Sequence, residues 1–403
     1  MILNLDNEYI FEGNFGLERE TLRVTSDGKL SQTPHPFEDK LLDRDFCENQ
    51  LEMITSVCKG IDELFKSLEK LDTVAREELK KLNEYLWMYS NPPYFSAEED
   101  IPIANFSEDM AEKQKYRENL ERRYGKRIML YSGIHYNFSF SDRLLKSLCD
   151  NDDFDDFKNK LYFRMAKQVS RYSWLPVLLT SASPVYDVSL DGDYNGGDGF
   201  DGSSSRRNST KGYWNQFLPI FDYTNLQTYI DGIRECVNDG RLLSEKELYM
   251  PVRLKSKGEY SLDSLEKYGV NHIELRMFDV NPLSPLGIFK ADAKFIHYFL
   301  IYLLSLPDFE FTSELQATAI KNHQVAAMYD ISEMKINGYN AVDAAVGMLD
   351  DMAVFFASCD KVLSNIKMQK EKITHNKRYC VEIYEKYHED YNKKMFETVK
   401  NGF

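Results

Sequence analysis

Two acidic residues stand two positions apart in the segment FGLERETLRV, and their spacing is the first sign of chemistry in this sequence. Glu18 and Glu20 would point to the same side of a β-strand, because successive side chains of a strand alternate between its faces. Two carboxylates held this close repel each other unless a cation lies between them. An exposed polar face on an edge strand would also explain one such pair, so the pair alone leaves the question open.

Three further segments place charged or ionisable residues on predicted strands whose other face is apolar or aromatic. They are DRDFCENQLEMIT with Asp45 and Glu52, GIHYNFSF with His135, Asn137 and Ser139, and NHIELRMFDVNP with His272, Glu274 and Arg276. Polar groups on strands this rich in apolar residues are more typical of a lined cavity than of a solvated surface. The four segments together therefore predict one polar cleft.

The residues of this predicted cleft combine carboxylates, one imidazole and nearby arginines. Oxygen-rich ligands without thiolates suit Mg²⁺ or Mn²⁺ and disfavour a structural zinc site. Several such ions in a cleft with arginines suit a nucleoside triphosphate and a phosphoryl group in transfer. No GxxxxGK[ST] sequence is present to bind the phosphates. The residues alone therefore predict a metal-dependent, ATP-using enzyme with an unusual nucleotide site.

The elements that must position these residues are strands with period-two alternation and helices with apolar residues three and four apart. The predicted strands are Gly16–Thr25, Gln50–Val57, Ile128–Phe140, Leu248–Leu254 and Asn271–Val280. The predicted helices are Ile61–Trp87, Glu108–Arg123, Phe154–Tyr172, Leu226–Val237, Pro285–Leu306 and Thr312–Met328, with two or three more from Ala341 onward. Because regular βα units are absent, we expect an α+β fold with a mixed or antiparallel sheet.

The loop Asp191–Gly202 contains two motifs that lack their usual context. It begins like a calcium-binding loop, but Gly202 stands where a bidentate Glu is required. It also contains GxGxxG, but Asp198 and Asp201 would repel a phosphate. We interpret the wider segment 187–205 as a surface loop, and we hypothesise that it is a mobile cover over the site.

Composition excludes several classes of function. The net charge of −15 over 403 residues disfavours nucleic acid as a partner. The longest apolar stretch, Phe295–Leu306, is too short to cross a membrane, and the N-terminus lacks the basic and apolar regions of a signal peptide. Six scattered cysteines without CxxC spacing indicate free thiols in a reducing cytoplasm. We expect a cytoplasmic monomer or weak homodimer.

At the residues of the predicted cleft, the sequence resembles the bacterial type of glutamate–cysteine ligase, also called γ-glutamylcysteine synthetase. The matching stretches are FGLERETLRVTSDGKLSQTPHP, RDFCENQLEMITSV, RYGKRIMLYSGIHYNFSF, SSRRNSTKGYWN, KELYMPVRLK and HIELRMFDVNPLSPLGI. They occur in the order expected of the family, from Gly16 to Ile288. The resemblance implies a glutamine-synthetase-like carboxylate–amine ligase fold, in which a sheet forms a funnel surrounded by helices.

The resemblance also implies roles for individual residues. The metal ligands would be Glu18, Glu20, Asp45, Glu52, His135 and Glu274, which would hold two or more Mg²⁺ ions, or Mn²⁺, together with ATP. Arg276 would contact the phosphoryl group during transfer. Substrates would be bound by Phe46, Tyr116, Arg117, Arg207, Tyr213, Tyr249 and Arg253. Met129 and Trp214 depart from the residues expected near the acceptor.

The implied reaction joins the γ-carboxylate of glutamate to the α-amine of cysteine through a γ-glutamyl phosphate, which is the first step of glutathione biosynthesis. Residues 1–359 would form the catalytic domain and residues 360–403 a helical extension. The absence of an ATP-grasp region before Phe403 implies a stand-alone enzyme that stops at the dipeptide. The alternatives are a ligase of the same fold with another amine, a phosphagen-type kinase, and a binding protein that keeps the scaffold.

Overall fold

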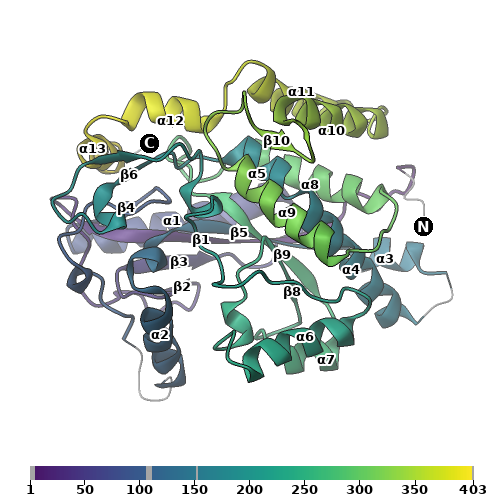
Figure 1. Cartoon of the computed structure of the whole chain (residues 1–403), viewed down its shortest axis with the longest axis horizontal. Coiled ribbons are helices and arrows are strands. Elements are labelled where there is room, and N and C mark those ends of the chain that lie inside the picture. The colour runs from purple at the N-terminus through teal and green to yellow at the C-terminus, as the bar shows by residue number, and fades with distance from the viewer. Residues whose placement is uncertain (1–4, 106–110, 151–152, 402–403) are drawn as a thin grey trace.

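The computed structural model describes residues 5–105, 111–150 and 153–401, and its centre is one antiparallel sheet (Figure 1). Among these residues the sheet has seven strands in the order β2-β3-β1-β5-β9-β8, with β4 also paired to β1. Its strands are β1 (Gly13–Thr25), β2 (Leu42–Asp43), β3 (Gln50–Ile54), β4 (Glu84–Trp87), β5 (Gly133–Phe140), β8 (Val252–Lys255) and β9 (His272–Asp279). Two small hairpins lie apart from it: β6 (Val185–Asp187) with β7 (Asp198–Phe200), and β10 (Lys335–Ile336) with β11 (Tyr339–Asn340).

Helices surround this sheet, and the α+β expectation with antiparallel strands is confirmed. The helices are α1 (Ile61–Lys81), α2 (Ala111–Tyr124), α3 (Asp142–Leu148), α4 (Phe154–Tyr172), α5 (Trp174–Thr180), α6 (Leu226–Asn238), α7 (Leu262–Tyr268), α8 (Lys290–Ser305), α9 (Ser313–Ala326), α10 (Ala341–Phe355), α11 (Asp360–Thr374), α12 (Tyr379–Tyr387) and α13 (Tyr391–Asn401). None of the helices in the described ranges combines the length and apolar character needed to cross a bilayer.

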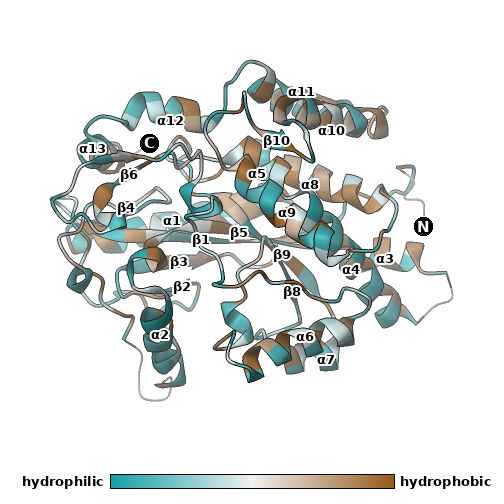
Figure 2. Cartoon of the chain, in the orientation of Figure 1, coloured by the Kyte–Doolittle hydropathy of each residue, from teal (hydrophilic) through white to brown (hydrophobic). Residues whose placement is uncertain are grey.

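The two faces of the sheet have different neighbours. Helices α1 and α8 cover one face: Arg19 of β1 pairs with Asp72 of α1, and the Tyr136 hydroxyl of β5 donates to the Ala293 carbonyl of α8. Figure 2 shows hydrophobic residues concentrated on α5 and α8, whereas α2 projects from the body as a hydrophilic helix. The opposite face carries Glu18 and Glu20. Strand alternation thus separates the helix-covered core from a polar cleft.

The strand register brings the predicted ligands together. Glu20 of β1 lies opposite Glu52 of β3, and Glu18 lies opposite His135 of β5. Between β5 and β9 the register shifts, so that Arg276 and Met277 together face His135. Such a bulge redirects side chains and interrupts the hydrogen-bonded ladder. The bulge therefore lies where β9 presents Arg276 to the cleft.

The prediction of one helix over Ile61–Trp87 is wrong at its C-terminal end. Helix α1 ends at Lys81, and the positive φ of Asn83 (59°) turns the chain back. The next residues form β4, which pairs with the C-terminal half of β1. The leucine spacing fits either a longer helix or a strand over residues 84–87. The strand pairs with β1 and gives Glu84 a buried ion-pair partner in Arg23. Tertiary contacts thus override the local helical pattern.

Other predicted elements begin or divide differently in the structure. The segment 127–130 is a short 3₁₀-helix, so the predicted strand Ile128–Phe140 begins only at Gly133. The predicted strand Leu248–Leu254 begins at Val252, and the predicted helix Pro285–Leu306 begins at Lys290. From Ala341 onward the described chain forms four helices instead of two or three. The helix Phe154–Tyr172 has the predicted bounds.

The last three helices pack on the rest of the chain through buried polar contacts. Lys372 of α11 donates to Asp292 of α8 (Nζ–Oδ1 2.6 Å). Tyr391 of α13 is buried, and its hydroxyl donates to the Asn91 carbonyl at 3.0 Å. Asp198 of β7 accepts from two backbone N–H groups at the start of α13. The segment 187–205 therefore packs against the C-terminal helices.

Candidate active site

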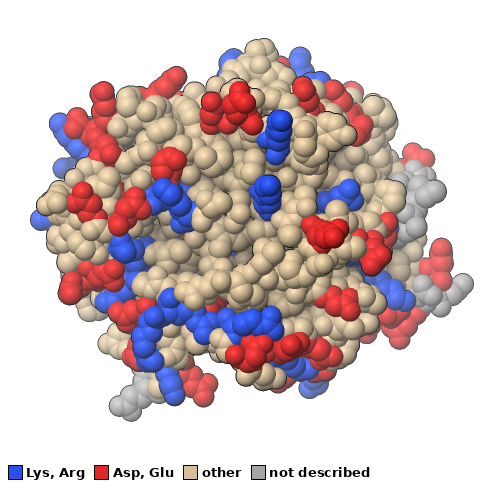
Figure 3. Space-filling view, in the orientation of Figure 1, with Lys and Arg blue, Asp and Glu red and all other residues tan. Residues whose placement is uncertain are grey.

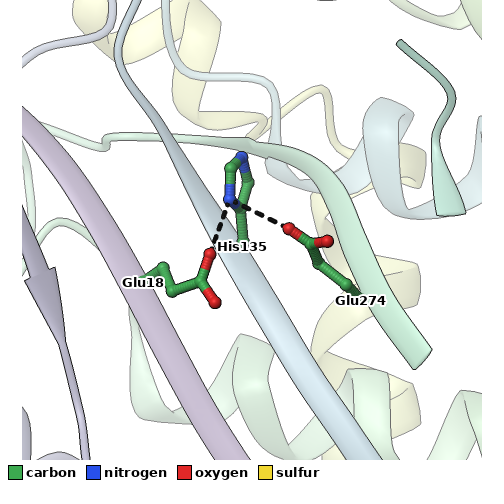
Figure 4. Close-up of side chains that lie close together, drawn as sticks. All are labelled: Glu18, His135 and Glu274. Atoms are coloured by element: carbon green, nitrogen blue, oxygen red, sulfur yellow. Dashed lines mark hydrogen bonds and ion pairs between the residues drawn. The ribbon is translucent and has the colours of Figure 1, made fainter. Parts of the chain in front are cut away.

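Three side chains from adjacent strands converge in the cleft (Figure 4). Nδ1 of His135 lies 3.1 Å from Oε2 of Glu18 and 3.3 Å from Oε1 of Glu274. Nε2 of the same ring points towards Glu20, at 3.6 Å from its Oε1. Two groups of potential metal ligands result, Glu18–His135–Glu274 and Glu20–Glu52–His135, each with ligand atoms within 4.8 Å of one another. The shared imidazole places the two groups side by side.

Glu274 is the carboxylate of the cluster that is best compensated by cations. Its burial alone would raise the pKa, but Arg276, Lys255 and Arg253 hold the pKa of Glu274 well below its ordinary value. The Arg276 Nη1–Glu274 Oε1 distance is 2.7 Å and the Lys255 Nζ–Glu274 Oε2 distance is 3.2 Å. Glu274 is therefore ionised, and it holds Arg276 in the cleft.

Glu20 and Glu52 are compensated less. His135, Arg207 and Arg276 act to lower the pKa of Glu20, but burial outweighs them. Burial raises the pKa of Glu20, and burial together with the charges of Glu18, Asp45 and Glu20 raises the pKa of Glu52 well above its ordinary value. In the described ranges, neither carboxylate has a Lys or Arg within ion-pair distance. This side of the cleft holds more negative charge than the chain itself neutralises. A donor set of carboxylate oxygens and one imidazole fits Mg²⁺ or Mn²⁺.

Asp45 belongs to the cleft but not to either ligand group. Its side chain is half exposed (52%) and pairs with Arg117 of α2, with an Nη2–Oδ1 distance of 3.4 Å. Arg117 also donates from Nε to the Asp45 backbone carbonyl. Asp45 thus lies at the wall of the cavity, where it connects the cleft to α2.

A cavity of about 790 Å³ opens from the carboxylate cluster. It is lined by Phe46, Tyr116, Arg117, Tyr213, Tyr249 and Arg253, together with the six predicted metal ligands and Arg276. The exposed Lys113, Lys115 and Lys246 also line it. Figure 3 shows Lys and Arg side chains gathered along the lower part of this face, between α2 and α6. A cavity with cations towards its opening suits anionic substrates.

Arg207 is the predicted substrate-binding residue that does not line this cavity. Its guanidinium passes behind Gly133, where a Cβ atom would lie only 2.4 Å from Nη2. Nη1 donates to the Phe278 carbonyl at 3.2 Å and Nη2 to the Arg276 carbonyl at 3.1 Å. Burial lowers the pKa of Arg207, while Asp279 and Glu20 oppose this. Arg207 therefore supports the floor of the cleft from behind.

One end of the cavity is aromatic. The rings of Tyr213 and Tyr249 lie 4.0 Å apart, and the Tyr213 hydroxyl lies 3.3 Å from the Met129 sulfur. Burial raises the pKa of both tyrosines well above the ordinary value and that of Tyr116 to about 12, so all three hydroxyls are neutral near pH 7. The buried Tyr249 hydroxyl contacts the Tyr213 side chain, which also acts on its pKa. This end suits a small, partly apolar group.

The two residues that depart from the expected pattern have different surroundings. Met129 contacts the aromatic end directly, through Tyr213. Trp214 lies behind it: its indole N–H donates to the Ser209 carbonyl at 2.7 Å, and its ring packs edge-on against His323. Met129 thus packs behind the aromatic end through Tyr213, whereas Trp214 supports the segment that carries Tyr213.

A second cavity of about 360 Å³ lies towards the other end of β1 and shares Glu18 and Ile54 with the first. Its lining includes Gly16, Asn137, Ser139, His272 and Lys158. The alternation of β5 and β9 predicted that Asn137, Ser139 and His272 line a cavity. Lys158 of α4 gave no signal in the sequence, because its helical pattern alone is that of a solvated residue. Residues 187–205 line neither cavity.

Lys255 is a further residue that the sequence reasoning missed. It lies on β8 opposite His272 and forms the closest lysine contact to Glu274. The sequence could have indicated Lys255, because it lies two residues after Arg253 and both side chains then share one face of a strand. The compensating charge on Glu274 therefore comes from two strands, β8 and β9.

An antiparallel sheet with a carboxylate-lined cleft and an arginine held among the acids is the arrangement of a metal-dependent ligase or phosphotransferase. A sequence model described as glutamate-cysteine ligase matches residues 2–237 and 204–326. The chain is 33% identical to a glutamate–cysteine ligase of Clostridium acetobutylicum, over 83% of this chain and 81% of that protein. The chain belongs to the glutamate–cysteine ligase family.

Other relatives are longer. The chain is 39% identical to the glutathione biosynthesis bifunctional protein of Listeria monocytogenes, and this similarity covers 91% of the chain but 51% of that protein. The chain thus spans about half the length of the bifunctional relatives. Among solved structures, the glutamate–cysteine ligase of Francisella tularensis in complex with AMP has the same fold, with a TM-score of 0.87 at 24% identity over 97% of this chain and 88% of that chain. A bifunctional glutathione synthetase from Pasteurella multocida matches with a TM-score of 0.84 at 28% identity, over 98% of this chain and 52% of that chain.

Proposed function

We propose that this protein joins the γ-carboxylate of L-glutamate to the α-amine of L-cysteine, with ATP as cosubstrate. The products would be γ-glutamylcysteine, ADP and phosphate. The observation that carries the proposal is that Glu20 and Glu52, which have no Lys or Arg partner among the described residues, line the larger cavity together with Arg276. Glu18 connects this cavity to the second one. The family membership and the names of the relatives support it.

The carboxylates Glu18, Glu20, Asp45, Glu52 and Glu274 and the imidazole of His135 would hold Mg²⁺, and the two ligand groups support two or more ions. Bound Mg²⁺ would neutralise the phosphate oxygens of ATP and offset the negative charge of the cluster. Arg276 lies beside this cluster, with its guanidinium held by Glu274. Its fixed positive charge would stabilise the charge that develops on the phosphoryl oxygens.

In the proposed reaction, a γ-carboxylate oxygen of glutamate attacks the γ-phosphorus of ATP, and ADP leaves. The resulting acyl phosphate carries a good leaving group in place of an oxide. The amine of cysteine then attacks the acyl carbon, loses a proton and displaces phosphate. The lysines and arginines of the larger cavity would bind the substrate carboxylates. The aromatic end at Tyr213 and Tyr249 would take the thiol side chain of cysteine.

We place the nucleotide in the second cavity. Gly16 forms part of its floor, and the absence of a side chain there leaves the backbone of β1 open to a flat ring. Asn137, Asn271 and Thr55 supply neutral donors and acceptors, which suit a base or a ribose. The shared Glu18 connects this cavity to the metal ligands. We further propose that the protein works in the cytoplasm, since all six cysteines are free thiols.

The test is phosphate release by the purified protein with Mg²⁺, ATP and glutamate, across a panel of amines. We expect cysteine to give the fastest release and a product with the mass of γ-glutamylcysteine. A different amine as the best acceptor would assign the protein to a ligase of another specificity, in which Met129 helps to shape the acceptor end. Release no faster with any amine than without one would contradict the ligase assignment.

A further inference from the structure

Arg276 is presented from a bulge, and its own backbone lacks part of the usual support. A bulge interrupts the hydrogen-bonded ladder between β5 and β9 at residues 276 and 277. The three successive carbonyls of Arg276, Met277 and Phe278 are instead bound by two neighbouring side chains. Arg207 donates to the first and third at 3.1 and 3.2 Å, and Nδ2 of Asn208 donates to the second at 2.9 Å.

Asn208 is itself fixed by three contacts. Its Nδ2 also donates to the Ser205 hydroxyl at 2.8 Å, and its Oδ1 lies 3.1 Å from Nε2 of His323 on α9. Since both Nδ2 hydrogens are used, Oδ1 must accept, and His323 must carry its proton on Nε2. Nδ1 of His323 then accepts from the Ser173 hydroxyl at 2.9 Å. This assignment gives every polar side-chain atom of Asn208 and His323 a partner. The Ser173 hydroxyl also lies 3.1 Å from the Ser170 carbonyl, so its single hydrogen is shared between that carbonyl and Nδ1 of His323.

The charge states in this region agree with that assignment. Burial, with a smaller effect from Arg207, lowers the pKa of His323 to about 3, so its imidazole is neutral near pH 7. At the other end, the Ser205 hydroxyl donates to the buried carboxylate of Asp279, which also accepts from the Ala182 N–H and the Ser183 hydroxyl, each bond at 2.8 Å. Ser173, Ser205, Asn208, Asp279 and His323 are each at most 5% exposed.

Packing alone does not fix this region. A void of about 40 Å³ lies among Arg207, Asn208, Tyr213, Arg276 and His323, which is room for roughly one water molecule. Side chains beside a void can shift, because they lack contact atoms on one side. Directed hydrogen bonds must therefore hold the bulge in place.

We infer that Asn208 and His323 are positioning residues for Arg276: His323 orients Asn208, and Asn208 with Arg207 clamps the backbone of the β9 bulge that presents the guanidinium. The inference rests on the proposed role of Arg276 in phosphoryl transfer. It gives a function to His323, a residue outside the predicted site, and it assigns Arg207 a structural task at the floor of the cleft.

His323→Leu tests the inference, because it leaves the buried Oδ1 of Asn208 without a donor. We expect kcat to fall roughly 10- to 100-fold, as for a misplaced catalytic group, while the KM values for ATP and glutamate change less than about 3-fold. His323→Gln keeps an amide donor near the position of Nε2, and we expect it to restore kcat to within about 5-fold of the wild type.

His297→Leu is the matched control. His297 is also buried, burial lowers its pKa to about 3, and its Nε2 has no hydrogen-bond partner among the residues that the structure describes. It packs among Phe11, Phe15 and Phe138 on the helix-covered side of the sheet. We expect His297→Leu to leave kcat unchanged.

If His323→Leu fails to fold, Ser173→Ala tests the same network, because it removes only the hydroxyl that contacts Nδ1 of His323. We expect it to lower kcat about 2- to 5-fold.

The outcomes separate this inference from the proposed function. An inactive wild type, or an Arg276→Ala variant with wild-type kcat, would refute the role of Arg276 and with it the inference. If Arg276→Ala is impaired but His323→Leu and Ser173→Ala both keep wild-type kcat, the positioning role is overturned. A fall in kcat for His323→Leu that His323→Gln does not reverse would also count against it.

Discussion

The two faces of strand β1 bury charged residues under opposite conditions. On the helix-covered face, Arg19 and Arg23 are fully buried, and each has an acidic partner within the chain. Arg19 pairs with Asp72 at 2.5 Å and Arg23 with Glu84 at 2.9 Å. On the cleft face, Glu20 and its neighbour Glu52 have no Lys or Arg partner among the described residues. The difference teaches that burial of charge alone does not mark a site.

The site is marked by buried negative charge that no nearby Lys or Arg side chain neutralises. Buried pairs such as Arg19–Asp72 contribute to the specificity and stability of the fold. Uncompensated carboxylates repel one another, and they persist where a ligand supplies the missing positive charge. The faces of β1 should therefore respond to mutation in opposite ways: substitutions on one face should change stability, and substitutions on the other should change activity.

The largest effect is expected from Arg276→Ala on the cleft face. Because the proposed role of this guanidinium is to stabilise the transition state, kcat should fall by about 100- to 1000-fold. The KM values should change little, and so should the melting temperature. Steady-state kinetics with thermal unfolding checks this prediction. A kcat equal to that of the wild type would refute the role.

Arg19→Met on the opposite face should show the reverse pattern. Removing the guanidinium leaves Asp72 buried with only Arg76, whose Nε lies 2.6 Å from Oδ2. We expect the free energy of unfolding in urea to fall by about 3 kcal/mol, with kcat retained at low temperature. Arg76→Met is the matched control: since Arg76 is partly exposed, its loss should cost under about 1 kcal/mol. A large loss of activity in folded Arg19→Met would contradict the division between the faces.

Glu52→Gln should sharpen the comparison, because it removes one uncompensated charge. In the absence of Mg²⁺ we expect the variant to melt about 2 °C higher than the wild type. The variant should also be less active than the wild type. Addition of Mg²⁺ and ATP should raise its melting temperature by less than that of the wild type. Differential scanning fluorimetry with and without Mg²⁺ measures both effects. A lower melting temperature without Mg²⁺ would show that Glu52 is compensated by the chain after all.

The smallest effect concerns pH. Burial alone would raise the pKa of Asp72, but Arg19 and Arg76 lower it below its ordinary value. Its ion pairs therefore stabilise the fold fully above the unfolded-state pKa of about 3.9, and this stability is lost as the pH falls through the folded-state value. Asp72→Asn should be less stable than the wild type at pH 6, and the difference should shrink below about pH 4. A difference independent of pH would refute the contribution of this carboxylate.

Much of the cleft could be predicted from the sequence, because strand alternation determines which side chains share a face. The pairs Glu18–Glu20 and Glu274–Arg276 appear at the predicted spacing on β1 and β9, which flank β5 on either side. The strand β4 could not be predicted, because its leucines also continue the helical pattern of α1. Its identity depends on pairing with β1, which is a tertiary contact.

The supporting residues were harder to predict than the carboxylates of the cleft. His323 lies on a helix far along the chain, and only the fold brings it to Asn208. Arg207 was predicted to bind a substrate, and this stays a prediction. In the structure its guanidinium donates to the backbone carbonyls of Arg276 and Phe278 behind Gly133. The bulge in β9 gives no signal in the alternation of residues 272–279. Such contacts depend on register and packing, which local patterns do not encode.

The central claim, that the cleft face of β1 serves phosphoryl transfer to glutamate, has one direct test. Glutamate labelled with ¹⁸O in its γ-carboxylate is incubated with the protein, Mg²⁺, ATP and cysteine, and the released phosphate is analysed by mass spectrometry. An acyl phosphate intermediate predicts that phosphate carries one ¹⁸O atom from glutamate, in amounts equal to the dipeptide formed. Unlabelled phosphate released together with dipeptide would contradict the account.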